Sequence, residues 1–318
     1  MLALLFPGQG SQEVGMAADV CRTSSAARGV FETADSALGF PLSRLCFEGP
    51  EEELVRTEIQ QPAVLCASVA LLRALEERCP LRPDFVAGHS LGEYTALVAA
   101  GALDFEDAVR LVHARGRFMQ EAVPQGRGAM AAVMGCPAEV VERACEAAVR
   151  ESGRVVAPAN YNGPAQTVIS GDAAAVESAC AHARQAGAKR AVPLEVSAPF
   201  HCGLMAPAAE KLALELARVR FADAAVPVVT NVEAAPCRAG ARFAALLEQQ
   251  VTAPVRFTEM ILALRAAGVD RVLEIGPGRV LSGLVGRIDR ELARASLSTQ
   301  DGIDEAAAFA SASGPLPS

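Results

Sequence analysis

The sequence predicts an α/β protein of two parts, a large domain built on a parallel sheet and a small α+β subdomain inserted into it. Two observations indicate this arrangement. Short apolar runs alternate with helical stretches along most of the chain, and the order of the expected elements changes between residues 126 and 196. The chain has 318 residues, of which 51% are hydrophobic. This is enough to bury one large core or two unequal ones.

The elements of the large domain follow from the apolar pattern. Short apolar runs bounded by turn residues are typical of buried parallel strands, and apolar residues that recur every three or four positions predict helices. We expect strands at 2–6, 85–88, 227–229 and 271–275, and helices at 62–78, 91–100 and 104–122.

Gly126 and Gly128 mark a hinge at the start of the inserted part. The pattern then predicts strand, helix, two strands, helix and strand, at 129–134, 137–151, 155–159, 167–170, 173–186 and 190–194. This order is that of a ferredoxin-like unit. We therefore assign residues 1–125 and 197–300 to the large domain and 126–196 to the small subdomain. Residues 306–318 are rich in Ala, Ser, Pro and Gly, and we expect a flexible tail there.

Composition argues against several classes of protein. The net charge is -8 with a pI near 5.2, Trp is absent and aromatic residues make up 4%, so a nucleic-acid partner is not expected. The nine cysteines form no Cys-x-x-Cys pair and the four histidines are widely spaced, so we expect free thiols, a cytoplasmic location and no metal site. The apolar start lacks a basic region, and no apolar run reaches membrane-spanning length.

The strongest chemical motif is Gly88-His89-Ser90-Leu91-Gly92, which has the G-x-S-x-G pattern of a nucleophile elbow. A predicted strand precedes it and a predicted helix follows it. In this setting the serine hydroxyl is exposed at a helix N-terminus, where the helix dipole favours a developing oxyanion. The alternative is a serine that only caps the helix between two incidental glycines.

A serine nucleophile needs a base, and His201 is the first candidate because it lies just before a predicted helix. The alternative is a loop histidine with a structural hydrogen bond. His89 is a rival base, although its side chain should point away from that of its neighbour Ser90. Cys202 is a rival nucleophile without a strand–turn–helix setting, so we interpret it as a small core residue.

The turn from Phe6 to Gln12 follows the first strand. It lacks the third glycine of a dinucleotide-binding fingerprint and the Gly-Lys-Ser/Thr of a P-loop. A glutamine on a glycine hinge at the carboxyl end of a strand can supply oxyanion donors.

Arg115 stands on a helix face that is otherwise apolar. It shares a stripe with Leu111, Phe118 and Ala122, whereas Arg117 lies on the polar face. A buried arginine needs a partner, since an unpaired buried charge is very costly. That partner is either an internal carboxylate such as Glu93 or the carboxylate of a substrate, which a guanidinium can bind with two parallel hydrogen bonds.

Eight blocks together resemble the malonyl-CoA:acyl carrier protein transacylase family, which includes free-standing acyltransferases of polyketide synthases. They occur in order and at compatible spacing from Phe6 to Leu297. The blocks are Gly8–Gln12, Gly88–Tyr94, Arg115–Gln120, Gly128–Met130, Asn160–Gln166, Pro199–His201, Gln250–Val255 and Glu274–Gly278. The resemblance implies a hydrolase-like α/β domain with a ferredoxin-like subdomain, which agrees with the pattern above.

The resemblance also implies a role for each matching residue. Ser90 is expected to be the nucleophile and His201 its base, oriented by the backbone carbonyl of Gln250. Arg115 is expected to bind the malonyl carboxylate. The backbone N–H groups of Gln9 and Leu91 are expected to form the oxyanion hole, and Phe200 and Met130 to set specificity.

The implied activity is transfer of malonyl from malonyl-CoA, a substrate rather than a cofactor, to an acyl carrier protein. No cofactor, nucleic acid or membrane is expected. Two rivals stay open: a hydrolase that clears acyl groups from carrier proteins, and an inactive docking module. Phe200 resembles the residue of malonyl-selective polyketide synthase domains and favours that pathway, while fatty-acid synthesis stays open.

Overall fold

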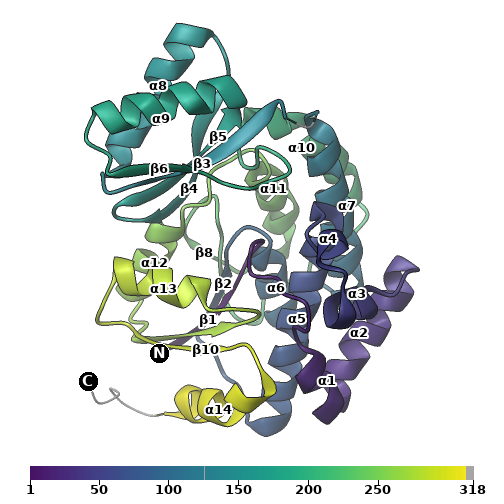
Figure 1. Cartoon of the computed structure of the whole chain (residues 1–318). Helices are drawn as coiled ribbons and strands as arrows, with labels where there is room; N and C mark the ends of the chain where they lie inside the picture. Colours follow the sequence, from purple (N-terminus) through teal and green to yellow (C-terminus); the bar gives the residue numbers. More distant parts are fainter. Residues whose placement is uncertain (125, 313–318) are drawn as a thin grey trace.

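The computed structural model describes residues 1–124 and 126–312. It contains a six-stranded sheet and a separate four-stranded sheet, which is the two-part α/β fold that the sequence predicts (Figure 1). Residue 125, where the expected first segment of the large domain ends, and residues 313–318 of the expected tail lie outside the described residues.

The six-stranded sheet has the order β10-β9-β1-β2-β7-β8 and is parallel except for the last pair. β1 lies in the middle, and all five of its residues are buried. Alternate β1 residues belong to different cores: Leu4 packs with one face and Leu5 with the other. The strands are β1 (Leu2–Phe6), β2 (Phe85–Gly88), β7 (Val228–Val229), β8 (Pro236–Cys237), β9 (Arg271–Ile275) and β10 (Ala293–Leu297).

Helices cover both faces of this sheet (Figure 1). The larger core includes residues of α2, α5 and α7, and the smaller core includes residues of α12 and α13. The helices are α1 (Ala18–Thr23), α2 (Ser25–Leu38), α3 (Leu42–Glu48), α4 (Glu51–Leu54), α5 (Thr57–Arg78), α6 (Gly92–Ala99), α7 (Phe105–Ala122), α10 (Ala206–Leu216), α11 (Gly240–Gln250), α12 (Phe257–Ala266), α13 (Val280–Ile288) and α14 (Ile303–Ser311), with short 3₁₀ turns at Gly203–Met205 and Gln300–Gly302.

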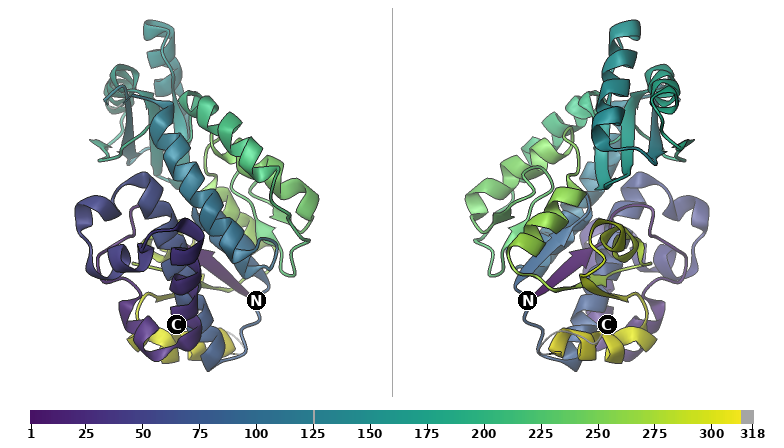
Figure 2. Two further views of the ribbon diagram at one scale, coloured as in Figure 1. Left: turned by 90° about the vertical axis from the view of Figure 1, so that its right-hand side faces the viewer. Right: turned by 90° about the vertical axis from the view of Figure 1, so that its left-hand side faces the viewer.

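The four-stranded sheet is antiparallel with the order β4-β5-β3-β6, which is the ferredoxin-like arrangement. α7 runs from the large domain toward this sheet, and α8 and α9 cover the face turned away from the large domain (Figures 1 and 2). The elements are β3 (Gly128–Met134), α8 (Ala138–Ser152), β4 (Val156–Gly163), β5 (Gln166–Asp172), α9 (Ala173–Gln185) and β6 (Arg190–Pro193).

Three expected boundaries are wrong by four residues or more, and one of them is the end of the strand expected at 155–159, which continues to Gly163 as β4. The helix expected from Pro62 begins at Thr57 and continues through Pro62, which has no N–H to donate to the carbonyl of Glu58. That carbonyl interacts instead with Nδ1 of His113 at 2.8 Å, so the helix tolerates the proline. The tail expected at 306–318 begins too early, since residues 306–311 belong to α14. Ile303 and Ala306 of that helix are buried against the large core, and this packing outweighs the small-residue composition.

Candidate active site

Ser90 stands on the sharp turn between β2 and α6 and adopts a left-handed backbone conformation with φ 52°. Such a conformation is strained for a residue with a side chain and is found where surrounding structure enforces it. The two glycines of the motif permit this conformation, because without side chains they let neighbouring backbone segments pass very close to them. A Cβ at Gly88 would lie 2.0 Å from the backbone of Gly92, and one at Gly92 would lie 2.0 Å from the carbonyl oxygen of Phe6. The sequence therefore builds a nucleophile elbow.

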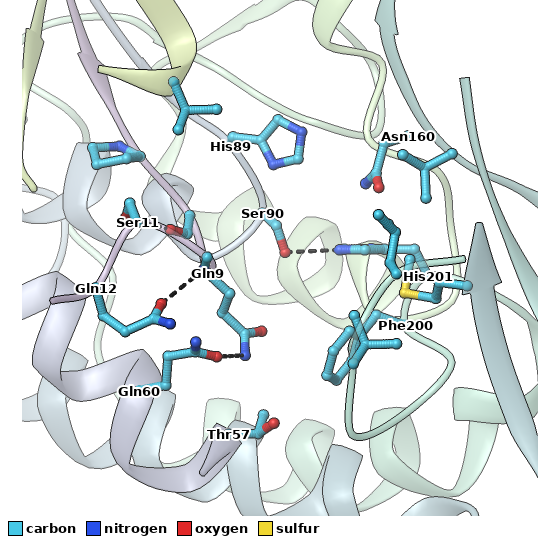
Figure 3. Close-up of a pocket in the computed structure, with 18 of the residues that line it drawn as sticks. Gln9, Ser11, Gln12, Thr57, Gln60, His89, Ser90, Asn160, Phe200 and His201 are labelled. Carbon is cyan, nitrogen blue, oxygen red and sulfur yellow. Dashed lines mark hydrogen bonds between the residues drawn. The ribbon is translucent and has the colours of Figure 1, made fainter. Parts of the chain in front are cut away.

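His201 lies within hydrogen-bond distance of this serine, with Nε2 2.7 Å from Ser90 Oγ (Figure 3). Its Nδ1 is 2.8 Å from the carbonyl oxygen of Gln250 and 3.2 Å from that of Ala253. Carbonyl oxygens only accept, so Nδ1 carries the proton and Nε2 is free to accept the serine proton. The imidazole is thus held in the tautomer of a general base. Its backbone, like that of Ser90, is left-handed, with φ 59°.

Burial, and after it the nearby Arg115 charge, lower the pKa of His201 to about 3. The imidazole is therefore neutral, and able to accept a proton, throughout the range from pH 5 to 8. His89, in contrast, faces away from the Ser90 hydroxyl: its Nε2 lies 2.8 Å from Asn162 Oδ1 and its ring packs near Phe257.

This environment predicts the pH dependence of acylation. We expect kcat/KM to show no His201 titration between pH 5 and 8 and to fall only as the pH drops toward the lowered pKa of the imidazole. Glu93, whose pKa burial raises to about 7, can add a step of its own. Stopped-flow measurement of the acylation rate in wild type and in Glu93→Gln separates the titration of His201 from that of Glu93. A step near pH 6.5 that persists in Glu93→Gln would show that His201 titrates as an ordinary imidazole.

His201→Ala should slow acylation by at least about 10²-fold, the lower end of what a positioned base contributes. His182→Ala serves as a matched control, because His182 lies on the outer face of α9 and interacts with Glu151. The measurement is single-turnover labelling by malonyl-CoA, with circular dichroism to verify the fold. An unchanged rate in folded His201→Ala would remove His201 from the reaction.

Arg115 is buried on α7, with 1% of its surface exposed, as its place on the apolar stripe predicts. Its guanidinium donates to Gln61 Oε1 at 2.7 Å, to Ser90 Oγ at 3.0 Å and to Gln250 Oε1 at 3.0 Å. Burial lowers its pKa, and its Nε has no partner among the described residues. The guanidinium therefore points at the nucleophile and keeps a free donor.

The internal ion pair considered as the alternative for Arg115 is not formed. Glu93, which is buried, receives hydrogen bonds from Gln250 Nε2 at 2.7 Å and from the Asn231 N–H at 3.0 Å, and makes no salt bridge with Arg115. Gln250 stands between the two charges, since its Oε1 accepts from Arg115. The backbone carbonyl of Gln250 thus contacts His201, and its side chain contacts both Arg115 and Glu93.

Gln9 and Leu91 are placed to supply oxyanion donors. Gln9 lies on the turn after β1 and lines the cavity in front of Ser90 (Figure 3). Leu91 follows Ser90 directly and stands at the start of α6. Within the described residues, neither backbone N–H donates a hydrogen bond to the protein. The side chain of Gln9 is fixed by a hydrogen bond of 2.6 Å to Gln60. Two free N–H groups beside a nucleophile can stabilise a tetrahedral oxyanion.

Phe200 and Met130 both line the same cavity, which has a volume of about 700 Å³ and lies between the two sheets of the protein. Phe200 directly precedes His201, and its ring is near the catalytic pair in Figure 3. Cys202, the rival nucleophile, is buried and its thiol donates to the Pro199 carbonyl; burial raises its pKa, which disfavours the thiolate.

Sequence reasoning missed several residues that the structure places at this site. Gln60, Gln61, Asn160 and Asn162 contact the site residues or line the cavity, and Asn231 contacts the elbow itself. Asn231 had a recognisable position, because it follows the strand at 227–229 at the carboxyl edge of the sheet, where ligands bind in such folds. Gln60 and Gln61 were missed because the expected helix starts at Pro62, whereas α5 begins at Thr57 and includes both glutamines.

The described residues contain no cluster of His, Cys, Asp or Glu that could hold a metal ion. No helix in the described part of the chain is long and apolar enough to cross a membrane.

The fold and the site geometry fit one class of protein: an α/β protein in which a serine hydroxyl, a neutral imidazole and two free N–H groups are arranged to move an acyl group through a serine ester. The chain belongs to the acyl transferase domain family, which it matches over residues 3–297. It is 49% identical over 296 residues to the malonyl CoA-acyl carrier protein transacylase of Escherichia coli K12, covering 93% of this chain and 95% of that one.

Solved structures are similar over nearly the whole chain. The malonyl CoA-acyl carrier protein transacylase of Coxiella burnetii superposes with a TM-score of 0.95 at 43% identity, covering 98% of both chains. A malonyl-transacylase in complex with a type II PKS acyl-carrier protein superposes with a TM-score of 0.93 at 46% identity, covering 96% of this chain and 98% of that one.

Proposed function

We propose that this protein transfers a malonyl group from malonyl-CoA to the phosphopantetheine thiol of an acyl carrier protein, through an ester on Ser90. The distance between the Arg115 guanidinium and Ser90 Oγ, 3.0 Å, carries this proposal. In a malonyl ester a single methylene separates the acyl carbon from the free carboxylate. A guanidinium this close to the nucleophile therefore suits the shortest dicarboxylic half-thioesters and leaves little room for longer ones.

In the first half-reaction Ser90 attacks the thioester carbonyl while its proton moves to Nε2 of His201. The N–H groups of Gln9 and Leu91 stabilise the oxyanion. When the intermediate collapses, the C–S bond breaks and the coenzyme A sulfur takes the proton from the imidazolium. The carbonyls of Gln250 and Ala253 hold the imidazole throughout, in place of the aspartate of a full triad.

In the second half-reaction the carrier thiol gives its proton to His201 and attacks the serine ester. The C–O bond to Ser90 breaks, and the hydroxyl recovers the proton. Each half-reaction thus returns the site to its starting protonation state, and no cofactor is needed. The names of the relatives support an acyl carrier protein as the acceptor and malonyl-CoA as the donor. We place the enzyme in the cytoplasm, where it supplies malonyl units for fatty-acid or polyketide synthesis.

The experiment that tests this function separates transfer from hydrolysis. The protein is incubated with malonyl-CoA, with and without a phosphopantetheine-bearing carrier protein, and malonyl-carrier and free malonate are measured together. We expect ping-pong kinetics with malonyl-carrier formed much faster than malonate. If malonate forms faster than malonyl-carrier, the protein is a hydrolase. If malonyl-CoA does not label the protein, it is a docking module.

Phe200 is expected to help exclude thioesters that are branched at the α-carbon, because its ring lines the cavity beside the base. One methyl group in a tight pocket is worth about 1–3 kcal/mol, so malonyl should be preferred over methylmalonyl by about 10–200-fold. Phe200→Ser should reduce that preference, measured as the ratio of kcat/KM values. A wild-type enzyme that uses both donors equally would refute this role.

A further inference from the structure

Asn231 makes two hydrogen bonds across the nucleophile elbow. Its Oδ1 accepts from the backbone N–H of Ser90 at 2.6 Å, and its Nδ2 donates to the carbonyl of Gly88 at 2.7 Å. The orientation of the amide is fixed, since a backbone N–H only donates and a carbonyl only accepts. The side chain is fully buried.

The position of Asn231 explains why an amide is needed there. β7 pairs with β2 in parallel only as far as Val229 opposite Ala87. The polar groups of Gly88 and Ser90 lie beyond the end of that pairing. The Asn231 side chain replaces the missing peptide group of β7, with one donor and one acceptor in the places that a strand would offer.

Asn231 is itself held from the other side of the elbow. Its backbone N–H donates to Glu93 Oε2 on α6 at 3.0 Å, and Gln250 Nε2 donates to the same oxygen at 2.7 Å. Gln250 Nε2 also lies 3.1 Å from the carbonyl oxygen of Ser90. The strained residue is therefore enclosed by hydrogen bonds on its N–H and its carbonyl.

We propose that Asn231 is a positioning residue that holds Ser90 in its left-handed conformation, so that Oγ meets His201 and the N–H of Leu91 stays free for the oxyanion. The proposal rests on the proposed function, because it assigns Asn231 to the nucleophile of that reaction. It differs from the role of Arg115 in one respect: Asn231 acts on every acyl donor, with or without a carboxylate.

The first test replaces Asn231 by alanine in the full chain. Because a displacement of the reacting atoms by about 1 Å costs about 10²-fold in rate, Asn231→Ala should slow Ser90 labelling by malonyl-CoA and acetyl-CoA by about that factor each, leaving their ratio unchanged. Labelling by a small neutral sulfonyl fluoride, which needs neither a carboxylate nor a carrier, should slow likewise. This second probe reports on the elbow even if malonyl transfer itself is absent.

Thr230→Val is the matched control. Thr230 is the preceding residue and equally buried, and its hydroxyl has no hydrogen-bond partner among the described residues. Its replacement should leave all three labelling rates unchanged. Wild-type labelling rates in folded Asn231→Ala would overturn the proposal, and so would an equal loss in Thr230→Val.

Asn231→Asp gives a readout that a merely structural residue does not produce. A protonated carboxyl has one acceptor and one donor and can replace the amide, whereas the carboxylate repels the Gly88 carbonyl. The labelling rate of Asn231→Asp relative to wild type should therefore rise as the pH falls from 8 to 5.5. The charged or titratable groups nearby are Glu93, Arg115, His201, His89, Glu233 and Arg256, whose backbone N–H donates to the Asn231 carbonyl. The ratio removes what these groups contribute on their own, and the same pair of measurements in a Glu93→Gln background removes the coupling between the new carboxyl and Glu93. A ratio that does not change with pH would contradict the proposal.

Discussion

Ser90→Ala is expected to abolish covalent labelling of the protein by malonyl-CoA while leaving the fold intact. The hydroxyl stands 2.7 Å from Nε2 of His201 and beside the two free N–H donors, which is the geometry that transfer of an acyl group to an oxygen needs. Only one small buried atom is removed, and the hydrogen bonds of the Ser90 backbone to Asn231 and Gln250 remain. Intact-protein mass spectrometry after incubation with malonyl-CoA measures the effect.

The control for this experiment is Cys202→Ala, which should label as fast as wild type. Cys202 is adjacent to the base, but its thiol is engaged with the Pro199 carbonyl and its pKa is raised by burial. A malonyl adduct on Ser90→Ala that disappears in the double variant would identify Cys202 as the nucleophile and refute the assignment to Ser90.

Much of the site could be predicted from the sequence, because short local sequence patterns determine the positions of its main residues. The elbow is encoded by two glycines around Ser90, and the burial of Arg115 by the apolar stripe on α7. The strand from Leu2 to Phe6 was predicted to the residue because all of it is buried, so that every position is apolar. The order of elements between 126 and 196 likewise sufficed for the ferredoxin-like arrangement.

The remainder depends on contacts between distant segments, which local patterns do not encode. Asn231 meets Ser90 only because β7 lies beside β2, across 141 positions of sequence. Gln61 reaches Arg115 because α5 packs on α7, and its helix began earlier than Pro62 suggested. The helix at 303–311 is stabilised by burial of a few side chains against the large core, which outweighs its weak composition. Tertiary packing decided each of these.

Arg115→Ala is expected to change the substrate preference of the enzyme rather than to inactivate it. A bidentate contact on the malonyl carboxylate comprises two charge-assisted hydrogen bonds, each worth about 1.5–3 kcal/mol. Losing both should reduce kcat/KM for malonyl-CoA by about 10²–10⁴-fold. Acetyl-CoA has no carboxylate and leaves the buried guanidinium without its anion, so its transfer should hold or improve in the variant.

Arg115→Lys provides the graded comparison, and succinyl-CoA tests the geometry. A lysine keeps the charge but cannot make the planar two-bond contact, so malonyl transfer should fall between wild type and Arg115→Ala. In wild type, succinyl-CoA should be a poor donor, since its extra methylene moves the carboxylate beyond the guanidinium that lies 3.0 Å from Ser90 Oγ. These measurements use kcat/KM for the three donors in each variant.

One outcome would reverse this interpretation. Arg115 also donates to Gln61 and Gln250, so its removal leaves buried acceptors without a partner and can disturb the site as a whole. Such a disturbance would lower malonyl and acetyl transfer by the same factor, because both depend on the same nucleophile and base. Equal losses would make Arg115 a structural residue. A loss confined to malonyl would mean that the buried charge is kept for the substrate, which supplies the carboxylate that the protein itself does not place beside Arg115.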